Sequence, residues 1–133
     1  MAETFDISGK KIWVAGHQGL VGRSLVRQLE KTNCEILTAS RCQIDLRRQA
    51  ETEDWIANKK PDVILLAAAK VGGISANNQH PAQFIHDNLA IAQNVIHAAY
   101  KTDVKKLVFL GSSCIYPKFA SQPIKEEELL TGA

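Results

Sequence analysis

The stretch KIWVAGHQGLVG, from Lys11 to Gly22, decides the fold of this chain. It opens with an almost continuously apolar run, which predicts a strand buried on both faces, as in a parallel sheet. Three glycines follow at the spacing G-x-x-G-x-x-G, and a helix is predicted from about Gly19 to Lys31 because apolar residues recur there at helical intervals. A strand, a glycine turn and a helix in this order are typical of the first unit of a dinucleotide-binding domain. The alternative is a glycine-rich turn that serves packing alone.

The chain beyond this unit repeats the alternation of strands and helices. Strands are predicted at residues 34–40, 62–69 and 107–111, the last of them buried. Helices are predicted at 47–60, which is polar, and at 81–99, where apolar residues step by three and four. With right-handed crossovers, this order predicts an α/β fold with a doubly wound parallel sheet of the Rossmann type, incomplete, with about four strands and crossover helices. The C-terminal tail predicts a loop that begins a helix.

The composition excludes several classes of protein. The chain has 133 residues, of which 45% are apolar and 23% charged, and a net charge of +2. This balance is ordinary for a soluble globular domain, and no basic cluster interleaved with aromatic residues predicts a nucleic-acid partner. No apolar run approaches the roughly 20 residues of a membrane span, and the start lacks the pattern of a signal peptide. The three cysteines Cys34, Cys42 and Cys114 have no metal-ligand spacing, so we predict reduced thiols in a cytoplasmic protein without a metal site.

The glycine turn predicts a site for the pyrophosphate of a dinucleotide. Gly16 allows the tight turn, Gly19 lets the backbone approach the phosphates, and Gly22 lets the helix pack closely on the strand. The helix N-terminus then faces the phosphates. For His17 the alternative to a phosphate contact is a solvated loop residue. The predicted site comprises Gly16, His17, Gln18, Gly19, Leu20, Val21 and Gly22.

The end of the second predicted strand favours NADP(H) over NAD(H). An acidic residue there would bind a ribose 2′-hydroxyl, but this chain has Ser40 and Arg41. A guanidinium can bind the oxygens of a 2′-phosphate in a forked geometry, whereas a solvated loop arginine is the alternative. Asp45 is a candidate for contact with the adenine edge. The predicted cofactor site also includes Leu46, Ala67, Ala68 and Ala69.

Two longer stretches carry a family resemblance. They are AAAKVGGI (67–74), followed closely by ANN, and LGSSCIYPK (110–118). Together with GHQGLVG they resemble the GDP-L-fucose synthases of the extended short-chain dehydrogenase/reductase superfamily, from about Lys11 to the last residue. The two longer motifs are far more specific than the glycine spacing. The resemblance implies an NADPH-dependent enzyme that epimerises GDP-4-keto-6-deoxymannose at C3 and C5 and then reduces the C4 ketone.

The resemblance also implies roles for the residues of LGSSCIYPK. Ser112 matches the active-site serine that hydrogen-bonds the substrate ketone, and Cys114 matches a cysteine implicated as an acid/base in epimerisation. A hydroxyl can stabilise a developing enolate and a thiol can transfer a proton, so both residue types suit this chemistry. For Cys114 the alternative is a small residue packed behind a strand. The strand end that lines the nicotinamide matches Leu110, Gly111, Ser112 and Ser113.

Two departures from the family pattern are visible. Gln18 stands where some relatives carry an arginine, and the family's Tyr-x-x-x-Lys pair has no counterpart, since Tyr100 and Tyr116 lack a lysine at that spacing. We therefore expect residues 1–133 to be the N-terminal NADP-binding domain of such an enzyme, ending before that pair and the substrate domain. By itself this chain is expected to show no NADPH oxidation above background. Its uncovered sheet edge predicts self-association, and the resemblance implies a homodimer at full length.

Two other functions stay open at this point. One is another NAD(P)-dependent nucleotide-sugar epimerase or dehydratase, and the other is a non-catalytic module that binds a dinucleotide. Lys70 is a candidate for contact with a phosphate or substrate, or for capping a loop. Asn88 is predicted to tie the long helix to the neighbouring strand loop.

Overall fold

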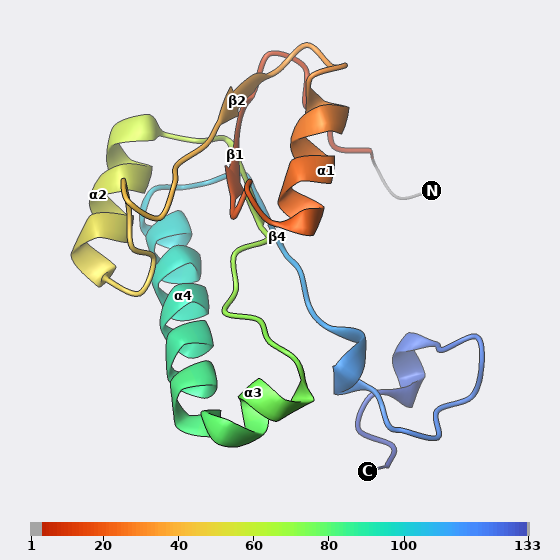
Figure 1. The fold of residues 1–133 in the computed structure, drawn as a ribbon. Coiled ribbons are helices and arrows are strands. Elements are labelled where there is room, and N and C mark those ends of the chain that lie inside the picture. Colours follow the sequence, from red (N-terminus) through yellow and green to blue (C-terminus); the bar gives the residue numbers. More distant parts are fainter. Residues whose placement is uncertain (1–3, 133) are drawn as a thin grey trace.

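A parallel sheet with helices on both faces forms the centre of the molecule, as the computed structural model of residues 4–132 shows (Figure 1). The strands are β1 (Lys11–Ala15), β2 (Glu35–Leu37), β3 (Val63–Leu66) and β4 (Lys106–Phe109). Their order in the sheet is β2-β1-β3-β4, and every neighbouring pair is parallel. The predicted doubly wound sheet is confirmed, although each of the last three strands is shorter than the sequence predicts.

The helices connect the strands as crossovers. They are α1 (Leu20–Leu29), α2 (Gln49–Lys59), α3 (Ile74–Gln79) and α4 (Pro81–Lys101). The long helix begins at Pro81, as predicted, because the fixed φ of proline suits the first helical position. The sequence did not predict α3, which is too short for a helical period to show. In the tail, the predicted start of a helix is a single 3₁₀ turn, Glu126–Glu128, and another 3₁₀ turn spans Ser113–Ile115.

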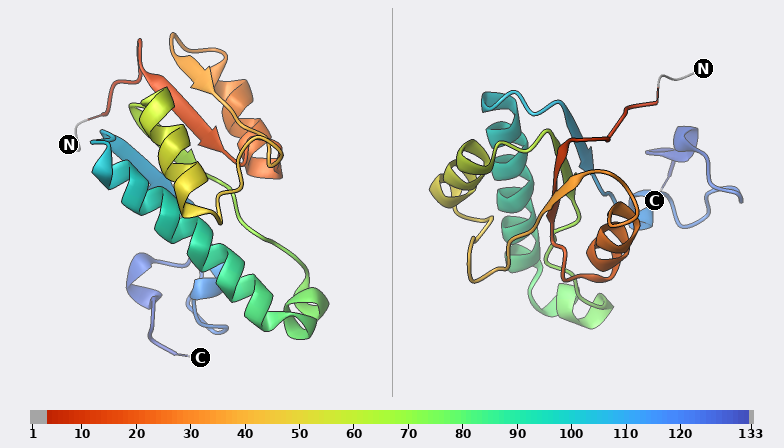
Figure 2. Two further views of the ribbon diagram at one scale, coloured as in Figure 1. Left: turned by 90° about the vertical axis from the view of Figure 1, so that its left-hand side faces the viewer. Right: turned by 90° about the horizontal axis from the view of Figure 1, so that it is seen from above.

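Two apolar cores lie on opposite faces of the sheet. Helix α1 covers one face, and α2 and α4 cover the other (Figure 2). Along β1 the side chains alternate, so that Ile12 and Val14 pack with α1 while Trp13 and Ala15 pack with α2 and α4. All four residues are buried, which explains why the first strand is apolar at successive positions.

The fourth strand is less buried than its sequence predicts. It lies at the edge of the sheet, where Leu107 packs against the core but Val108 and Phe109 are 37% and 52% exposed. Leu110 and Gly111, which the sequence assigns to the strand, follow it without strand structure. The prediction of a buried strand is therefore wrong for this edge. Val108 points to the face opposite Leu107, and Phe109 is the last residue of the strand.

The sheet order determines where a ligand can bind. The chain leaves β1 for β2 on one side and reaches β3 on the other side of β1. The loops that follow β1 and β3 therefore diverge, and ligands of open α/β sheets bind at the crevice that such a switch point creates. No helix among residues 4–132 combines the length and the apolar character that crossing a membrane requires.

Candidate functional site

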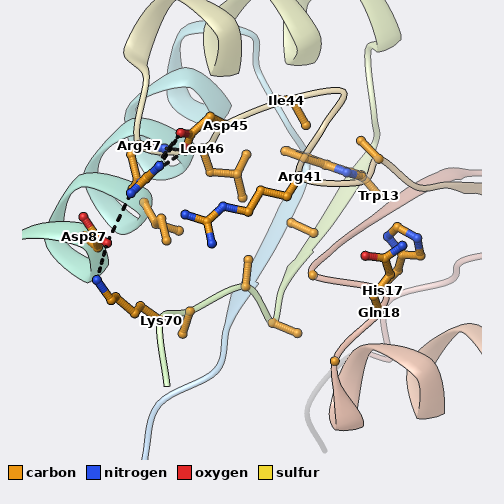
Figure 3. A pocket seen from close by; sticks show the side chains of 18 residues that line it. Trp13, His17, Gln18, Arg41, Ile44, Asp45, Leu46, Arg47, Lys70 and Asp87 are labelled. Carbon is orange, nitrogen blue, oxygen red and sulfur yellow. Dashed lines mark hydrogen bonds and ion pairs between the residues drawn. The ribbon is translucent and has the colours of Figure 1, made fainter. Parts of the chain in front are cut away.

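A pocket of about 230 Å³ lies at this switch point (Figure 3). Its walls come from the glycine turn after β1, the loop between Ala39 and Arg47 after β2, and the residues 67–70 after β3. Asp87 and Ile91 of α4 complete the wall. The pocket is thus assembled from the carboxyl ends of three neighbouring strands and from one helix of the facing layer.

Most of the cofactor residues predicted from the sequence line this pocket. They are Gly16, His17, Gln18, Gly19, Arg41, Asp45, Leu46, Ala67, Ala68 and Ala69. The other predicted cofactor residues lie outside its walls. Leu20 and Val21 are exposed in the first turn of α1, and Gly22 is buried beneath the glycine turn. The segment 110–114 is exposed beyond the end of β4.

The glycine turn needs glycine at two of its three positions. Gly16 has a φ of +90°, and a Cβ there would lie 2.6 Å from the backbone nitrogen of Ala68. A Cβ on Gly22 would overlap the carbonyl oxygen of Gly16. At Gly19 a Cβ would meet only that same oxygen, at 3.4 Å. The first and third glycines therefore bring loop, strand and helix together, and the second leaves open space at the start of the helix.

The N-terminus of α1 fits the phosphates of a dinucleotide. Gly19 is its N-cap, no side chain caps it, and its first turn contains no acidic residue. The first backbone hydrogen bond of the helix runs from the Arg23 amide to the Gly19 oxygen, so the preceding amides of the first turn are available to an anion. The Nδ1 atom of His17, beside this turn, is buried without a hydrogen-bond partner. These groups suit phosphate oxygens, which are strong hydrogen-bond acceptors.

Arg41 presents an unpaired guanidinium to the same pocket. Its side chain lies across the cavity in Figure 3, and it makes no ion pair with any residue from 4 to 132. An arginine whose guanidinium makes no ion pair suits an anionic ligand. Its predicted role at a 2′-phosphate stays a prediction.

A network of four charged side chains forms the wall farthest from the glycine turn. Asp45 accepts hydrogen bonds from Arg47 Nε at 2.9 Å and Nη2 at 2.7 Å. Asp87 accepts from Lys70 Nζ at 2.9 Å and from Arg47 Nη1 at 3.3 Å. Arg47 is thus the partner of both carboxylate oxygens of Asp45. The contact with adenine that the sequence predicts for Asp45 stays a prediction.

The network keeps its carboxylates ionised. The hydrogen bond from Arg47 lowers the pKa of Asp45 to about 2. Hydrogen bonds from Lys70 and then from His86 lower the pKa of Asp87 to about 2. Both groups are therefore charged at every pH at which the protein would work, and the ion pairs persist across that range.

Asn88 fixes the backbone of the loop after β3. Its Oδ1 accepts from the Lys70 amide at 2.8 Å, and its Nδ2 donates to the Lys70 oxygen at 3.0 Å. The predicted tie between the long helix and this loop is confirmed. The pocket is also lined by residues that no sequence pattern indicated, among them Ile44, Arg47, Asp87 and Ile91. Arg47 follows Asp45 by two positions and Asp87 precedes Asn88, but the position of α4 beside the pocket is a tertiary feature that no local pattern shows.

The two catalytic candidates lie beyond β4, outside the pocket. Ser112 is the N-cap of the 3₁₀ turn, and its Oγ accepts a hydrogen bond from the Cys114 amide at 3.2 Å. A hydroxyl oriented in this way keeps its own proton for another acceptor, such as a ketone oxygen. The Cys114 thiol is free and exposed. Both side chains are at the carboxyl edge of the sheet, the same edge that holds the pocket.

Known proteins resemble this chain over most of its length. A GDP-L-fucose synthase from Sinorhizobium fredii is 53% identical over 126 residues, which are 95% of this chain and 40% of that protein. GDP-L-fucose synthase 1 from Arabidopsis thaliana is 56% identical over 135 positions, covering 99% of this chain and 42% of that protein. The chain therefore spans about 40% of the length of these curated relatives.

A solved structure and a family model match as well. MlghC, a GDP-mannoheptose C4 reductase from Campylobacter jejuni with NADP bound, matches with a TM-score of 0.87 at 38% identity, over 97% of this chain and 41% of that one. Residues 12–133 match the model of the NAD dependent epimerase/dehydratase family. That range includes the glycine turn, the pocket and the serine–cysteine segment, and the chain belongs to the NAD dependent epimerase/dehydratase family.

Proposed function

We propose that this chain is the N-terminal, NADP(H)-binding part of a cytoplasmic enzyme that makes GDP-L-fucose. The enzyme would epimerise GDP-4-keto-6-deoxymannose at C3 and C5 and reduce the C4 ketone with NADPH. The observation that carries the proposal is the pocket at the β1/β3 switch point, with its glycine turn, uncapped helix and Arg41. The names of the relatives and the NADP bound to MlghC support the same conclusion.

Each part of the site has a task in this proposal. The amides at the start of α1 bind the pyrophosphate, and Arg41 binds the 2′-phosphate. The bound dinucleotide supplies the hydride that reduces the ketone. Ser112 donates its hydroxyl proton to the ketone oxygen, which acidifies the neighbouring carbon positions, and Cys114 transfers protons there during epimerisation.

A chimera tests this chemistry. Residues 12–133 would replace the matching segment of the Sinorhizobium fredii relative. We expect this protein to oxidise NADPH only when GDP-4-keto-6-deoxymannose is present. Ser112→Ala should lower kcat at least about 100-fold, as the loss of an oxyanion donor does, and absorbance at 340 nm measures the rate.

Ser121→Ala is the matched control, since Ser121 is an exposed serine in the tail. It should leave the rate unchanged. A chimera that binds NADPH but never oxidises it with the keto-sugar would favour the non-catalytic module. An unchanged rate in Ser112→Ala would remove Ser112 from the proposed mechanism.

We also propose that the enzyme is a homodimer in which α4 faces a second copy. The outer face of α4 presents large apolar side chains, with Ile85 62%, Leu89 61% and Ile96 44% exposed. Their spacing places them on one side of the helix, away from the buried Val95 and Ala99. Such a stripe on the surface is typical of a protein–protein contact.

Leu89→Glu should shift the chain to monomer while NADPH affinity stays within twofold, because Leu89 is outside the pocket. A carboxylate buried at the interface without a partner would oppose association. Sedimentation equilibrium over a range of concentrations measures the effect. Gln28→Glu, at an exposed position of α1 on the opposite face of the sheet, is the control that adds the same charge. A wild-type chain that is monomeric at all concentrations would contradict this part of the proposal.

A further inference from the structure

Asp87 is a buried carboxylate whose two cationic partners come from two different loops of the pocket. The residue is only 7% exposed, on the inner side of α4. Its Oδ2 atom accepts from Lys70 Nζ at 2.9 Å, in the loop after β3, and from Arg47 Nη1 at 3.3 Å, in the loop after β2. Its Oδ1 atom lies 3.3 Å from His86 Nδ1. One carboxylate therefore joins α4 to both loops (Figure 3).

Stability alone is a weak reason for such an arrangement. Removing a carboxylate from water is costly, and buried ion pairs are often no more stabilising than apolar residues of the same shape. Asp87, Lys70 and Arg47 all line the pocket. Their position at the wall of a ligand site points to a role in holding that wall in one geometry.

Lys70 is the residue whose position depends most on Asp87. A lysine side chain is long and flexible, and an unpaired one on the protein surface occupies many rotamers. Here Asp87 holds the ammonium, the Phe84 ring lies 5.4 Å from it, and Asn88 fixes the backbone on both sides. An ammonium has three protons, so the bond to Asp87 leaves donors for a ligand. Groups held in their binding geometry beforehand bind more tightly, because less freedom is lost on binding.

We infer that Asp87 is a positioning residue of the dinucleotide site, which acts by holding the Lys70 ammonium at the pocket wall. In this proposal Asp87 acts through Lys70 rather than as a contact of its own. Arg47 fastens the same carboxylate to the loop that carries Asp45. The inference rests on the proposed dinucleotide site and adds to it the residue that orients one of its cations.

The test is a set of NADPH titrations, followed by the fluorescence of the nucleotide, on the wild type and on variants at positions 87 and 70. Asp87→Asn should weaken NADPH binding about tenfold, and Lys70→Met by about as much, since a charge-assisted hydrogen bond is lost in each. The double variant should bind no more weakly than Lys70→Met, because the two changes remove the same interaction. Asp87→Glu restores the carboxylate and should bring the affinity back to within about threefold of the wild type.

Glu53→Gln is the matched control for the loss of a carboxylate that pairs with a lysine across helices. Glu53 joins α2 to Lys101 of α4, with Oε2 and Nζ 2.8 Å apart, and lies outside the pocket. Glu53→Gln should leave NADPH affinity within twofold of the wild type. If binding depended only on the general stability of α4, this variant would lose affinity as well.

Three results would overturn the inference. They are an affinity within twofold of the wild type for Asp87→Asn, the same for Lys70→Met, and a double variant about 100-fold weaker, which would make the two residues independent. Because Lys70 is partly exposed, its variant tests the inference even if Asp87→Asn does not fold. A wild-type chain that binds no NADPH would instead refute the proposed function, and the inference with it.

Discussion

Gly22→Ala is expected to lower the free energy of unfolding by about 3 kcal/mol. The new Cβ would overlap the carbonyl oxygen of Gly16 and lie 2.8 Å from the Cα of His17. All of these neighbours are backbone atoms, so no side chain can rotate away and α1 must move off the glycine turn. That movement would also displace the helix N-terminus from the proposed phosphate site. Urea denaturation followed by circular dichroism measures the loss of stability.

Gly73→Ala is the control for this substitution. Gly73 is the N-cap of a helix and exposed, its φ is −68°, and a Cβ there would meet nothing within 4 Å. We expect the free energy of unfolding of this variant to lie within about 1 kcal/mol of the wild-type value. Equal stability of Gly22→Ala and the wild type would show that α1 does not pack on the turn as closely as the structure has it.

Arg41→Asp is expected to weaken NADPH binding at least about 100-fold and NADH binding by less than about threefold. A forked pair between guanidinium and phosphate contributes about 1.5–3 kcal/mol, and the introduced carboxylate adds repulsion to its loss. About 2.8 kcal/mol corresponds to a factor of 100. NADH lacks the 2′-phosphate, so its binding neither loses the forked pair nor meets the added repulsion. Parallel titrations with the two nucleotides measure the change in preference.

Arg48→Asp is the control, because Arg48 lies in the same segment and is exposed but is outside the pocket. It should leave the preference for NADPH unchanged. A preference that survives in Arg41→Asp would show that another group binds the 2′-phosphate.

The parts of the fold that were predictable from the sequence are those with a local cause. The turn at Gly16, the helix that starts after Gly19 and the start of α4 at Pro81 each depend on the conformation of a few successive residues. The order of strands and helices then limits the sheet to few arrangements. The loops that form the site follow from that order, because the carboxyl ends of parallel strands share one edge.

The features that the sequence did not reveal depend on packing between distant segments. The exposure of Val108 and Phe109 depends on the edge position of β4, and an apolar run looks the same at an edge and in the centre. Asp87 is separated from Arg47 by 40 residues and from Lys70 by 17. Only the docking of α4 beside the sheet brings these three charges together. The family resemblance implied that Ser112 lines the nicotinamide, whereas the structure has it outside the walls of the pocket.

The sheet order has a consequence for how the site comes into being. The glycine turn and its helix are contiguous in the chain, but the opposite wall of the pocket follows β3, and Gly16 contacts Ala68 across about 50 intervening residues. A folding intermediate with only the first strand and helix would therefore have half of the pocket. A nucleotide that binds between the two walls would stabilise only states in which β3 has already joined β1. In such a protein, cofactor binding would come late in folding and would favour the completed sheet over its partly assembled precursors.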